Sequence, residues 1–394
     1  MAPMKVLMFG WEFPPYSVGG LGKVTYYLSN ALTKLGTKIS LIVPIKCESD
    51  KLKILPTNLI KIKGINTLLS PYLTEKSYQY LLSEEEAKIY GGNLKEEISR
   101  FTDRGVELAK EEDFDVIHCH DWMTFQAGIK TKEASSKPLI LHVHTTEFDR
   151  SCGGCNPYVY NIEAEGFNKA DKIIAVSNYT KKKILDNYKV DENKIEVVHN
   201  AIEFNSETPN RKTPQRKKVV LYFGRISMHK GPDYFIKAAK KVIEYDKEVV
   251  FVMAGGGELL PEMINLACDL GIGDKLLFTG RLKDEGVKEI YNSADLYVLP
   301  SVSEPFGITV LEAASNGVPV IASNNSGVKE VLSNCFTVDF WDTDEMANKV
   351  LSILKYSGIK EEMSNNAYKE LKNISWNNRA AEINNIYASI SNYN

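Results

Sequence analysis

Two glutamates in the second half of the chain flank a glycine that can bring backbone close to a ligand. Glu304, Gly307 and Glu312 lie in a stretch that follows the apolar run 296–299 and leads into helical composition. A strand, a tight turn and a helix would put the N–H groups after Gly307 at the positive end of a helix dipole, where phosphate is stabilised. Carboxylates repel phosphate but accept hydrogen bonds from hydroxyl groups. The pattern favours a ligand with a central diphosphate and a polyol at each end, such as a nucleotide-sugar; the alternative is a helix start with two solvated glutamates.

Two cations follow an earlier predicted strand of the same half. Residues 219–223 are apolar, and Arg225 and Lys230 lie in the loop after them. The carboxyl ends of parallel strands share one edge of a sheet, so both cations can converge with Glu304. A guanidinium makes a forked contact and an ammonium acts as a point charge, a combination suited to a diphosphate leaving group. Alone, each would be an ordinary surface residue; together with the two glutamates they favour a function.

The first half offers a glycine-rich turn between a predicted strand at 6–9 and a predicted helix at 24–35. Gly19 and Gly20 in this turn allow the backbone to approach a phosphate at a helix start. The turn fits neither the dinucleotide fingerprint nor the P-loop.

Asp121 and His144 each follow a further predicted strand of the first half. Both therefore fall at the edge of the sheet where α/β proteins bind ligands. His118 and His142 lie within strands and are predicted to be core residues.

The repeated alternation of strands and helices predicts an α/β protein with two doubly wound domains and a cleft between them. We place the first domain at 1–203, a polar linker at 204–218 and the second domain at 219–374. A C-terminal helix at 375–394 can pack back on the first domain. Residues 47–104 read as loops and short elements.

Composition limits the partners and the location. The 48 Lys and Arg against 51 Asp and Glu give a net charge of −3, which offers no general attraction to nucleic acid. No apolar run approaches the ~20 residues of a membrane span, so we expect a cytoplasmic protein with no transmembrane segment. Six cysteines agree with a reducing compartment, and Cys152 and Cys155 lack a second pair at zinc spacing.

Several of these residues together resemble the motifs of a known family. They are Gly19-Gly20-Leu21, His120-Asp121-Trp122, His144, Gly224-Arg225 with Lys230-Gly231, and Glu304-Pro305-Phe306-Gly307 with Glu312. Over essentially its whole length the chain resembles the retaining GT-B glycosyltransferases of group 1, near the glycogen and starch synthase branch. The resemblance implies two Rossmann-like domains that face a central cleft.

The resemblance also implies a role for each matching residue. Glu304 would hold hydroxyls of the donor sugar, Glu312 the ribose, and Arg225 and Lys230 the diphosphate. His144 would face the reacting sugar, and Asp121 would line the acceptor side. The implied catalytic residues are His144, Arg225, Lys230 and Glu304; the implied donor-binding residues are Gly19, Gly20, Arg281, Leu282, Phe306, Gly307, Ile308, Thr309 and Glu312.

The implied reaction is transfer of a hexosyl group, with glucosyl preferred, from a nucleotide-diphosphate sugar to an acceptor hydroxyl with retention. An α-glucan is a candidate acceptor, and neither a metal nor a cofactor is expected. A nucleotide-sugar 2-epimerase and a non-catalytic nucleotide-sugar-binding protein stay open as alternatives. Ser17 stands where glycogen synthases carry lysine, and 200–203 read Asn-Ala-Ile-Glu, so the donor base stays open as well.

Overall fold

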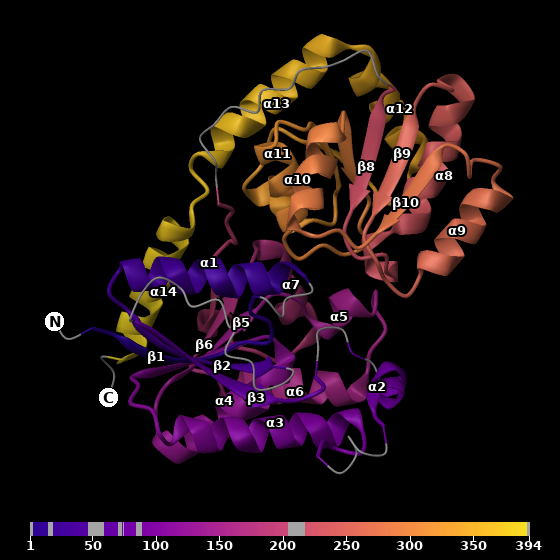
Figure 1. Cartoon of the computed structure of the whole chain (residues 1–394). Coiled ribbons are helices and arrows are strands. Elements are labelled where there is room, and N and C mark those ends of the chain that lie inside the picture. The colour runs from indigo at the N-terminus through magenta and orange to yellow at the C-terminus, as the bar shows by residue number, and fades with distance from the viewer. Residues whose placement is uncertain are drawn as a thin grey trace. The chain divides into compact units, whose positions relative to one another are not determined.

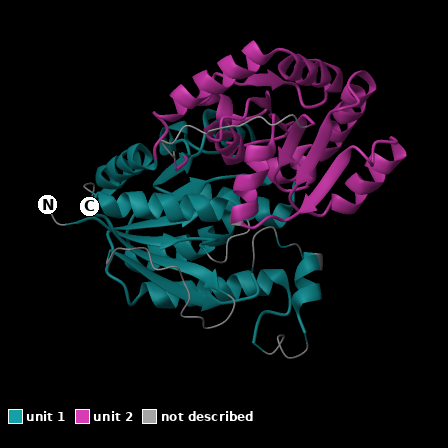
Figure 2. Ribbon diagram, turned by 45° about the horizontal axis from the view of Figure 1, so that its top comes forward, with its two compact units in different colours: residues 1–147, 155–201, 376–394 teal, residues 148–154, 202–375 magenta. Residues whose placement is uncertain are grey.

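The computed structural model describes residues 3–14, 19–45, 59–69, 73, 75–83, 89–203 and 217–391. The chain divides into two compact units, which Figure 2 shows in teal and magenta. Unit 1 comprises residues 1–147, 155–201 and 376–394, and unit 2 comprises residues 148–154 and 202–375.

Unit 1 is built on a seven-stranded parallel sheet with the order β3-β2-β1-β4-β5-β6-β7. Its strands are β1 (Lys5–Phe9), β2 (Lys38–Ile45), β3 (Ile60–Asn66), β4 (Val116–His120), β5 (Leu139–Val143), β6 (Lys172–Ala175) and β7 (Ile195–Val197). Its helices are α1 (Gly20–Lys34), α2 (Glu75–Leu81), α3 (Leu94–Ala109), α4 (Trp122–Ser135), α6 (Pro157–Lys169), α7 (Asn178–Asn187), the 3-10 turn η2 (Glu192–Lys194) and α14 (Trp376–Ser391). Every residue of β4 and β5 is buried, as expected for central strands covered on both faces.

Unit 2 is built on a six-stranded parallel sheet with the order β10-β9-β8-β11-β12-β13. Its strands are β8 (Val219–Phe223), β9 (Val250–Ala254), β10 (Leu276–Gly280), β11 (Leu296–Leu299), β12 (Val320–Ser323) and β13 (Phe336–Val338). Its helices are η3 (Met228–Lys230), α8 (Pro232–Tyr245), α9 (Leu260–Asp269), α10 (Asp284–Ser293), α11 (Ile308–Ser315), η4 (Gly327–Glu330), α12 (Thr343–Lys355) and α13 (Ser357–Leu371). The short helix α5 (Glu147–Arg150) begins at the last residue of a unit 1 segment and continues in unit 2.

Both sheets have the strand order of a doubly wound Rossmann-like domain, 3-2-1-4-5-6 counted within each unit, with one further strand in unit 1. This confirms the predicted fold class. In such sheets the ligand crevice lies at the carboxyl ends of the strands where the order reverses. The reversal falls between β1 and β4 in unit 1 and between β8 and β11 in unit 2.

The C-terminal helix α14 belongs to unit 1, where it lies beside α1 (Figure 1). Trp376 stacks on Tyr27 of α1 with ring centroids 6.3 Å apart. Thr37 Oγ1 donates a hydrogen bond to Asn384 Oδ1 at 3.2 Å, and Tyr387 is fully buried. Aromatic burial therefore ties the last helix to the first domain of the chain.

The structure differs from the sequence prediction in two places. Residues 148–154, assigned from sequence to the first domain, group with unit 2, where Ser303 Oγ donates to the buried carboxylate of Asp149 at 2.6 Å. In the segment 47–104, read from sequence as loops and short elements, β3 and α2 are short as predicted, but the 16-residue helix α3 begins at Leu94. Most of the predicted linker, residues 204–216, lies outside the described residues.

None of the helices in the described part of the chain has the length and apolar character needed to cross a membrane.

Candidate active site

The candidate site of unit 2 is assembled at the point where the strand order reverses. β8 and β11 are hydrogen-bonded neighbours. Arg225 and Lys230 lie in the loop after β8, and Glu304 lies in the loop after β11. The structure therefore brings the predicted cations and the first predicted glutamate to one edge of one sheet.

Two close contacts join these loops. Ser303 N donates a hydrogen bond to His229 O at 3.2 Å. Gly231 has a φ of +62°, and a Cβ added there would lie 2.1 Å from the carbonyl oxygen of Pro300. Only glycine fits so close an approach, so the backbone itself fixes the loop of Lys230 against the loop of Glu304.

Glu304 and Lys230 form a partly buried ion pair. Lys230 Nζ lies 2.6 Å from Glu304 Oε2, with side-chain exposures of 20% and 7%. Ser301 Oγ donates to the same carboxylate oxygen at 3.1 Å. The backbone of Glu304 is held by Asn325 O and Gly327 N, at 2.9 and 3.0 Å. The carboxylate is thus fixed in position on both its side chain and its backbone.

Arg225 has a carboxylate partner that sequence reasoning missed. Its Nη2 lies 3.1 Å from Glu258 Oε2, in the loop between β9 and α9. Tyr222 OH donates to Arg225 O at 2.7 Å. Nothing in the spacing of Glu258 pointed to Arg225, because the pair joins loops that follow different strands.

The turn before α11 has the conformation that the sequence predicts. Gly307 has a φ of +100°, in the left-handed region that favours glycine, and it caps α11 with no side-chain hydrogen bond. A Cβ there would lie 3.4 Å from Glu304 Cγ, so the turn and the glutamate are adjacent. Ile308 and Thr309 occupy the first turn of α11, where amides lack an earlier helical carbonyl. Phe306, just before the turn, is buried.

Two buried tyrosines make hydrogen bonds to Thr309 and Glu312 of α11. Tyr291 OH lies 3.0 Å from Glu312 Oε2 and 3.2 Å from Thr309 O. Tyr297 OH lies 2.8 Å from Thr309 Oγ1 and 2.9 Å from Phe223 O. Burial raises the pKa of both phenols well above 10, so both stay protonated and can donate. Sequence reasoning missed these tyrosines, because they reach Thr309 and Glu312 from a different helix and a strand.

Arg281 and Leu282 lie at the same edge of the sheet, directly after β10. Gly256, in the loop after β9, lies so close to Arg281 that an added Cβ would meet its Cγ at 3.0 Å. The arginine therefore packs against the glycine loop of the neighbouring strand.

In unit 1 the glycine turn is held by a buried acid. Gly19 N donates to Glu12 Oε2 at 3.0 Å, and Glu12 is almost fully buried. Gly19 caps α1 and Gly20 is its first residue. Ser17, where the sequence departs from the glycogen synthase pattern, lies outside the described residues.

Asp121 acts on the backbone of His144. Its Oδ1 accepts hydrogen bonds from His144 N at 2.7 Å and from Thr145 N at 3.3 Å. Asp121 has a φ of +58°, which is unusual for a residue other than glycine. The structure therefore brings the two predicted residues of unit 1 together and shows a contact that sequence reasoning did not foresee.

Four histidine rings, one of them that of His144, lie next to one another along β4 and β5. His118 and His120 belong to β4, and His142 and His144 come from β5 and the residue after it. Neighbouring rings have centroids 4.3 to 5.3 Å apart. His118 and His142 are buried within their strands, as predicted. We call these four residues the histidine cluster.

Burial keeps the rings of the histidine cluster neutral. It lowers the pKa of His118, His142 and His144 well below 6.5 and the pKa of His120 to about 3. His120 Nδ1 lies 2.9 Å from His144 Nε2, and His118 Nε2 lies 3.2 Å from His142 Nδ1.

Comparison with known proteins identifies the family to which this site belongs. A family model described as glycosyl transferases group 1 matches residues 204–370, and one described as glycosyltransferase family 4 matches residues 18–205. The chain belongs to the group 1 glycosyltransferases. It is an enzyme that uses a nucleotide-sugar donor, and its fold is GT-B.

Named relatives and solved structures agree with this family. An uncharacterized glycosyltransferase of Methanocaldococcus jannaschii is 29% identical over 98% of both chains. A glycogen synthase of Mycobacterium tuberculosis is 26% identical over 84% of this chain and 80% of its own. The structure of sucrose-phosphate synthase from Thermosynechococcus elongatus has a TM-score of 0.81 at 18% identity, covering 99% of this chain and 100% of its own. That likeness shows the shared fold.

Three rings of the histidine cluster in this glycosyltransferase offer nitrogens within 4.8 Å of one another: His118, His120 and His142. Both nitrogens of His118 already have hydrogen-bond partners, and the rings of His118 and His120 are stacked at 14°. Lone pairs lie in the ring plane, so stacked rings do not converge on one ion. Among the described residues, Cys152 and Cys155 are not part of a further metal-binding group.

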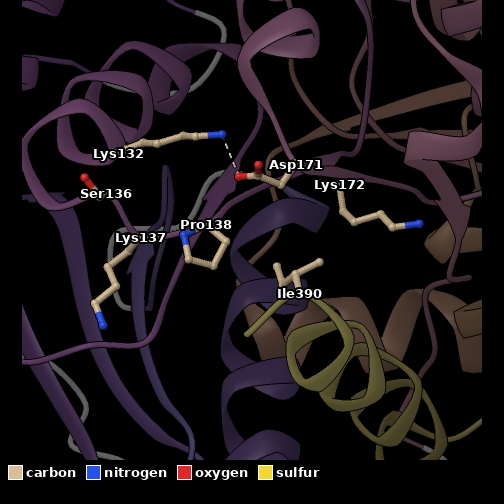
Figure 3. Close-up of a pocket in the computed structure, with 7 residues that line it drawn as sticks. All are labelled: Lys132, Ser136, Lys137, Pro138, Asp171, Lys172 and Ile390. Carbon is tan, nitrogen blue, oxygen red and sulfur yellow. Dashed lines mark hydrogen bonds and ion pairs between the residues drawn. The ribbon is translucent and has the colours of Figure 1, made fainter. Parts of the chain in front are cut away.

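A pocket of the glycosyltransferase lies at the amino ends of β5 and β6 in unit 1, whereas the predicted site residues follow the carboxyl ends of the strands. It is lined by residues at the end of α4 and before β5, by residues at the start of β6 and by one residue of α14. Figure 3 shows them: Lys132, Ser136, Lys137, Pro138, Asp171, Lys172 and Ile390. Lys132 Nζ is bonded to Asp171 at 2.7 Å, and Lys172 Nζ lies 2.8 Å from Glu196. Two of its three lysines are thus paired, and the pocket contains none of the predicted site residues.

Proposed function

We propose that this enzyme transfers a glucosyl group from a nucleotide-diphosphate sugar to an acceptor hydroxyl, with retention of configuration at the anomeric carbon. The observation that carries the proposal is the Lys230–Glu304 ion pair, which lies beside Gly307 at the start of α11. A cation, a fixed carboxylate and a helix N-terminus meet where α/β sheets bind nucleotides. This is the set of groups that a sugar diphosphate requires.

Each predicted site residue of unit 2 that carries a charge has a role in the proposal. Lys230, Arg225 and the first amides of α11 meet the negative charge of the diphosphate. Glu304 accepts hydrogen bonds from hydroxyls of the donor sugar, and Glu312 accepts them from the ribose. Arg281 and Leu282, next to the glycine loop after β9, border the base.

The proposed chemistry follows the movement of charge. As the bond between the anomeric carbon and the phosphate oxygen breaks, negative charge grows on the diphosphate and positive charge grows on the sugar. Cations that are already oriented lower the barrier, because they need no reorganisation as the charge develops. The departing phosphate accepts the proton of the acceptor hydroxyl, and the new bond forms on the face that the phosphate leaves. Glu304 is bound to Lys230 and Glu312 to Tyr291, so we assign neither as a covalent nucleophile.

We further propose that the reaction needs no metal ion, because Arg225 and Lys230 supply the positive charge. His144 faces the reacting sugar in this proposal, and Asp121 lies on the acceptor side. An α-glucan is the proposed acceptor, since a named relative over most of the chain is a glycogen synthase.

A panel of ADP-, UDP- and GDP-sugars, each with and without malto-oligosaccharide, tests the proposal. We expect release of nucleoside diphosphate that depends on the acceptor, an α-linked product by NMR, and unchanged turnover in EDTA. Isomerisation of the sugar without acceptor would instead indicate a 2-epimerase. Binding without turnover of any donor would indicate a sugar-nucleotide sensor and would contradict the proposal. An inverted product, or activity lost in EDTA and restored by Mg²⁺, would contradict its mechanism.

A further inference from the structure

His144 is held at two points by two consecutive residues. Its backbone N donates to Asp121 Oδ1 at 2.7 Å, and its ring Nε2 lies 2.9 Å from Nδ1 of His120. His120 is fully buried at the end of β4. The last residue of β4 therefore contacts the ring of His144, and the residue after it contacts the backbone.

The bond between the two rings couples their protonation. Both imidazoles are neutral, so each carries one N–H and one lone pair. If His120 Nδ1–H donates, His144 accepts at Nε2 and must carry its own proton on Nδ1. If His144 Nε2–H donates, His120 accepts at Nδ1 and must carry its proton on Nε2. In either case the two rings share the same tautomer.

The remaining nitrogen of His144 has no hydrogen-bond partner among the described residues. Its Nδ1 is buried and has no hydrogen bond within the described residues, although the side chain as a whole is partly exposed. A buried polar atom without a partner costs about 1–3 kcal/mol. The bond to His120 is therefore the hydrogen bond that the described residues supply to the His144 ring.

We propose that His120 is a positioning residue for His144: the bond between the two rings fixes the orientation of the His144 ring and ties its tautomer to that of His120. The inference rests on the proposed function, because it takes His144 as the residue that faces the reacting sugar. His120 itself acts through His144 and does not touch the substrate.

The other pair of the histidine cluster provides a matched control. Tyr387 OH lies 2.5 Å from His118 Nδ1, and His118 Nε2 lies 3.2 Å from His142 Nδ1. His118 is as fully buried as His120 and lies on the same strand, β4, but it makes no hydrogen bond to His144. Loss of the His118 imidazole therefore tests the effect of removing one ring from the cluster, while the hydrogen bond between His120 and His144 is kept.

Nitrogen-15 NMR of the histidine rings tests the coupling directly in the full-length protein. The chain has six histidines, which single substitutions assign. We expect His120 and His144 to show the same tautomer. We also expect the tautomer populations of His144 to change in His120→Leu but not in His118→Leu. Opposite tautomers, or His144 signals unchanged in a folded His120→Leu protein, would overturn the proposal.

Kinetics test the consequence for the reaction. His120→Leu should lower kcat by about 10- to 100-fold through misorientation, with the KM for the donor changed less than about threefold. His120→Asn places an amide group near the position of Nδ1 and should restore most of kcat. Equal losses in folded Leu and Asn variants, or an equal loss in His118→Leu, would overturn the positioning role. If the wild-type enzyme transfers no sugar, the proposed function fails while the NMR result still decides the coupling.

Discussion

At the scale of single residues, the Lys230–Glu304 pair joins two charges that the proposed reaction uses separately. Lys230 meets the leaving group, and Glu304 meets the sugar. Their contact at 2.6 Å fixes the distance between the two functions, and Ser301 holds the carboxylate from a second direction. Removing either partner leaves the other charge partly buried and unbalanced.

Substitution of Lys230 with alanine is therefore expected to lower kcat by roughly 10³-fold, because a preorganised cation is lost at the leaving group. Steady-state kinetics with the donor found by the panel measures this. Lys230→Arg keeps the charge and should retain more activity, although its forked head does not reproduce the single contact to Glu304. Turnover of Lys230→Ala close to that of the wild type would refute the role of Lys230.

Glu258 is expected to compete with the donor for Arg225. The pair is more exposed than Lys230–Glu304, so its own contribution to stability is small, ~0–1 kcal/mol. Glu258→Gln removes a negative charge beside the guanidinium and should tighten binding of nucleoside diphosphate by about two- to fivefold, less at high salt. Isothermal titration calorimetry measures the effect. Glu262→Gln, at an exposed acid in the first turn of α9, is the matched control, and weaker binding by Glu258→Gln would contradict the competition.

At the scale of elements, the strand, turn and helix around Gly307 could be predicted closely from sequence. The apolar run 296–299 is β11, and Gly307 has the positive φ that a glycine at this turn permits. These features are local, so residue type and spacing determine them. The partners of Glu312 and Thr309 could not be predicted in this way, because Tyr291 and Tyr297 reach them from other elements.

Tyr291 is expected to act as a positioning residue for Glu312. Tyr291→Phe removes the hydroxyl 3.0 Å from the carboxylate but keeps the buried ring, so the fold should lose only about 1 kcal/mol. Because Glu312 meets the ribose in the proposal, the KM for the donor should rise several-fold while kcat changes little. Kinetics and thermal unfolding measure the two effects.

Tyr387→Phe is the control for Tyr291→Phe. Tyr387 is another fully buried tyrosine with one side-chain hydrogen bond, but it lies on α14 in unit 1. We expect a similar loss of stability without a change in KM. A rise in KM for Tyr387→Phe as large as that for Tyr291→Phe would show that the effect is a general loss of stability.

At the scale of the whole molecule, the alternation of strands and helices predicted two doubly wound domains, and both are present. Alternation does not determine the assignment of segments whose partners are distant in the chain. Residues 148–154 group with unit 2 through the bond from Ser303 to Asp149, although their neighbours in sequence belong to unit 1. The histidine cluster arises in the same way, since only the pairing of β4 with β5 places His120 opposite His142.

The histidine cluster makes the stability of unit 1 depend on pH. Each unfolded histidine takes up a proton near pH 6.5, whereas burial keeps the folded rings neutral to much lower pH. The contribution to stability is therefore complete above pH 6.5 and is lost as pH falls. Each ring lowers the free energy of unfolding by up to about 1.4 kcal/mol for every pH unit below 6.5. Four rings together can remove much of a typical stability of about 5–15 kcal/mol.

Carboxylates act in a lower range of pH. Although burial raises the pKa of Glu112, hydrogen bonds from Lys61, Lys63 and Ser40 lower it to about 2. Such a carboxylate begins to lower the free energy of unfolding only as pH falls below 4.5, where the unfolded chain takes up the proton. The interval from pH 6.5 to 5 therefore reports mainly on histidines.

Hydrogen exchange read by mass spectrometry between pH 7.5 and 5 tests this at the level of each unit. Unit 2 contains a single histidine, His229, whose pKa is lowered by burial and by Lys230, Arg225 and Arg150. After correction for the intrinsic exchange rate, peptides of β4 and β5 should lose protection with pH about four times as steeply as peptides of β8 and β11. Replacing His142 with phenylalanine should make the loss of protection with pH in unit 1 less steep by the equivalent of one proton, because one titrating ring is removed from the cluster. Equal slopes in the two units would contradict a neutral histidine cluster, since only the number of buried rings distinguishes them in this pH range.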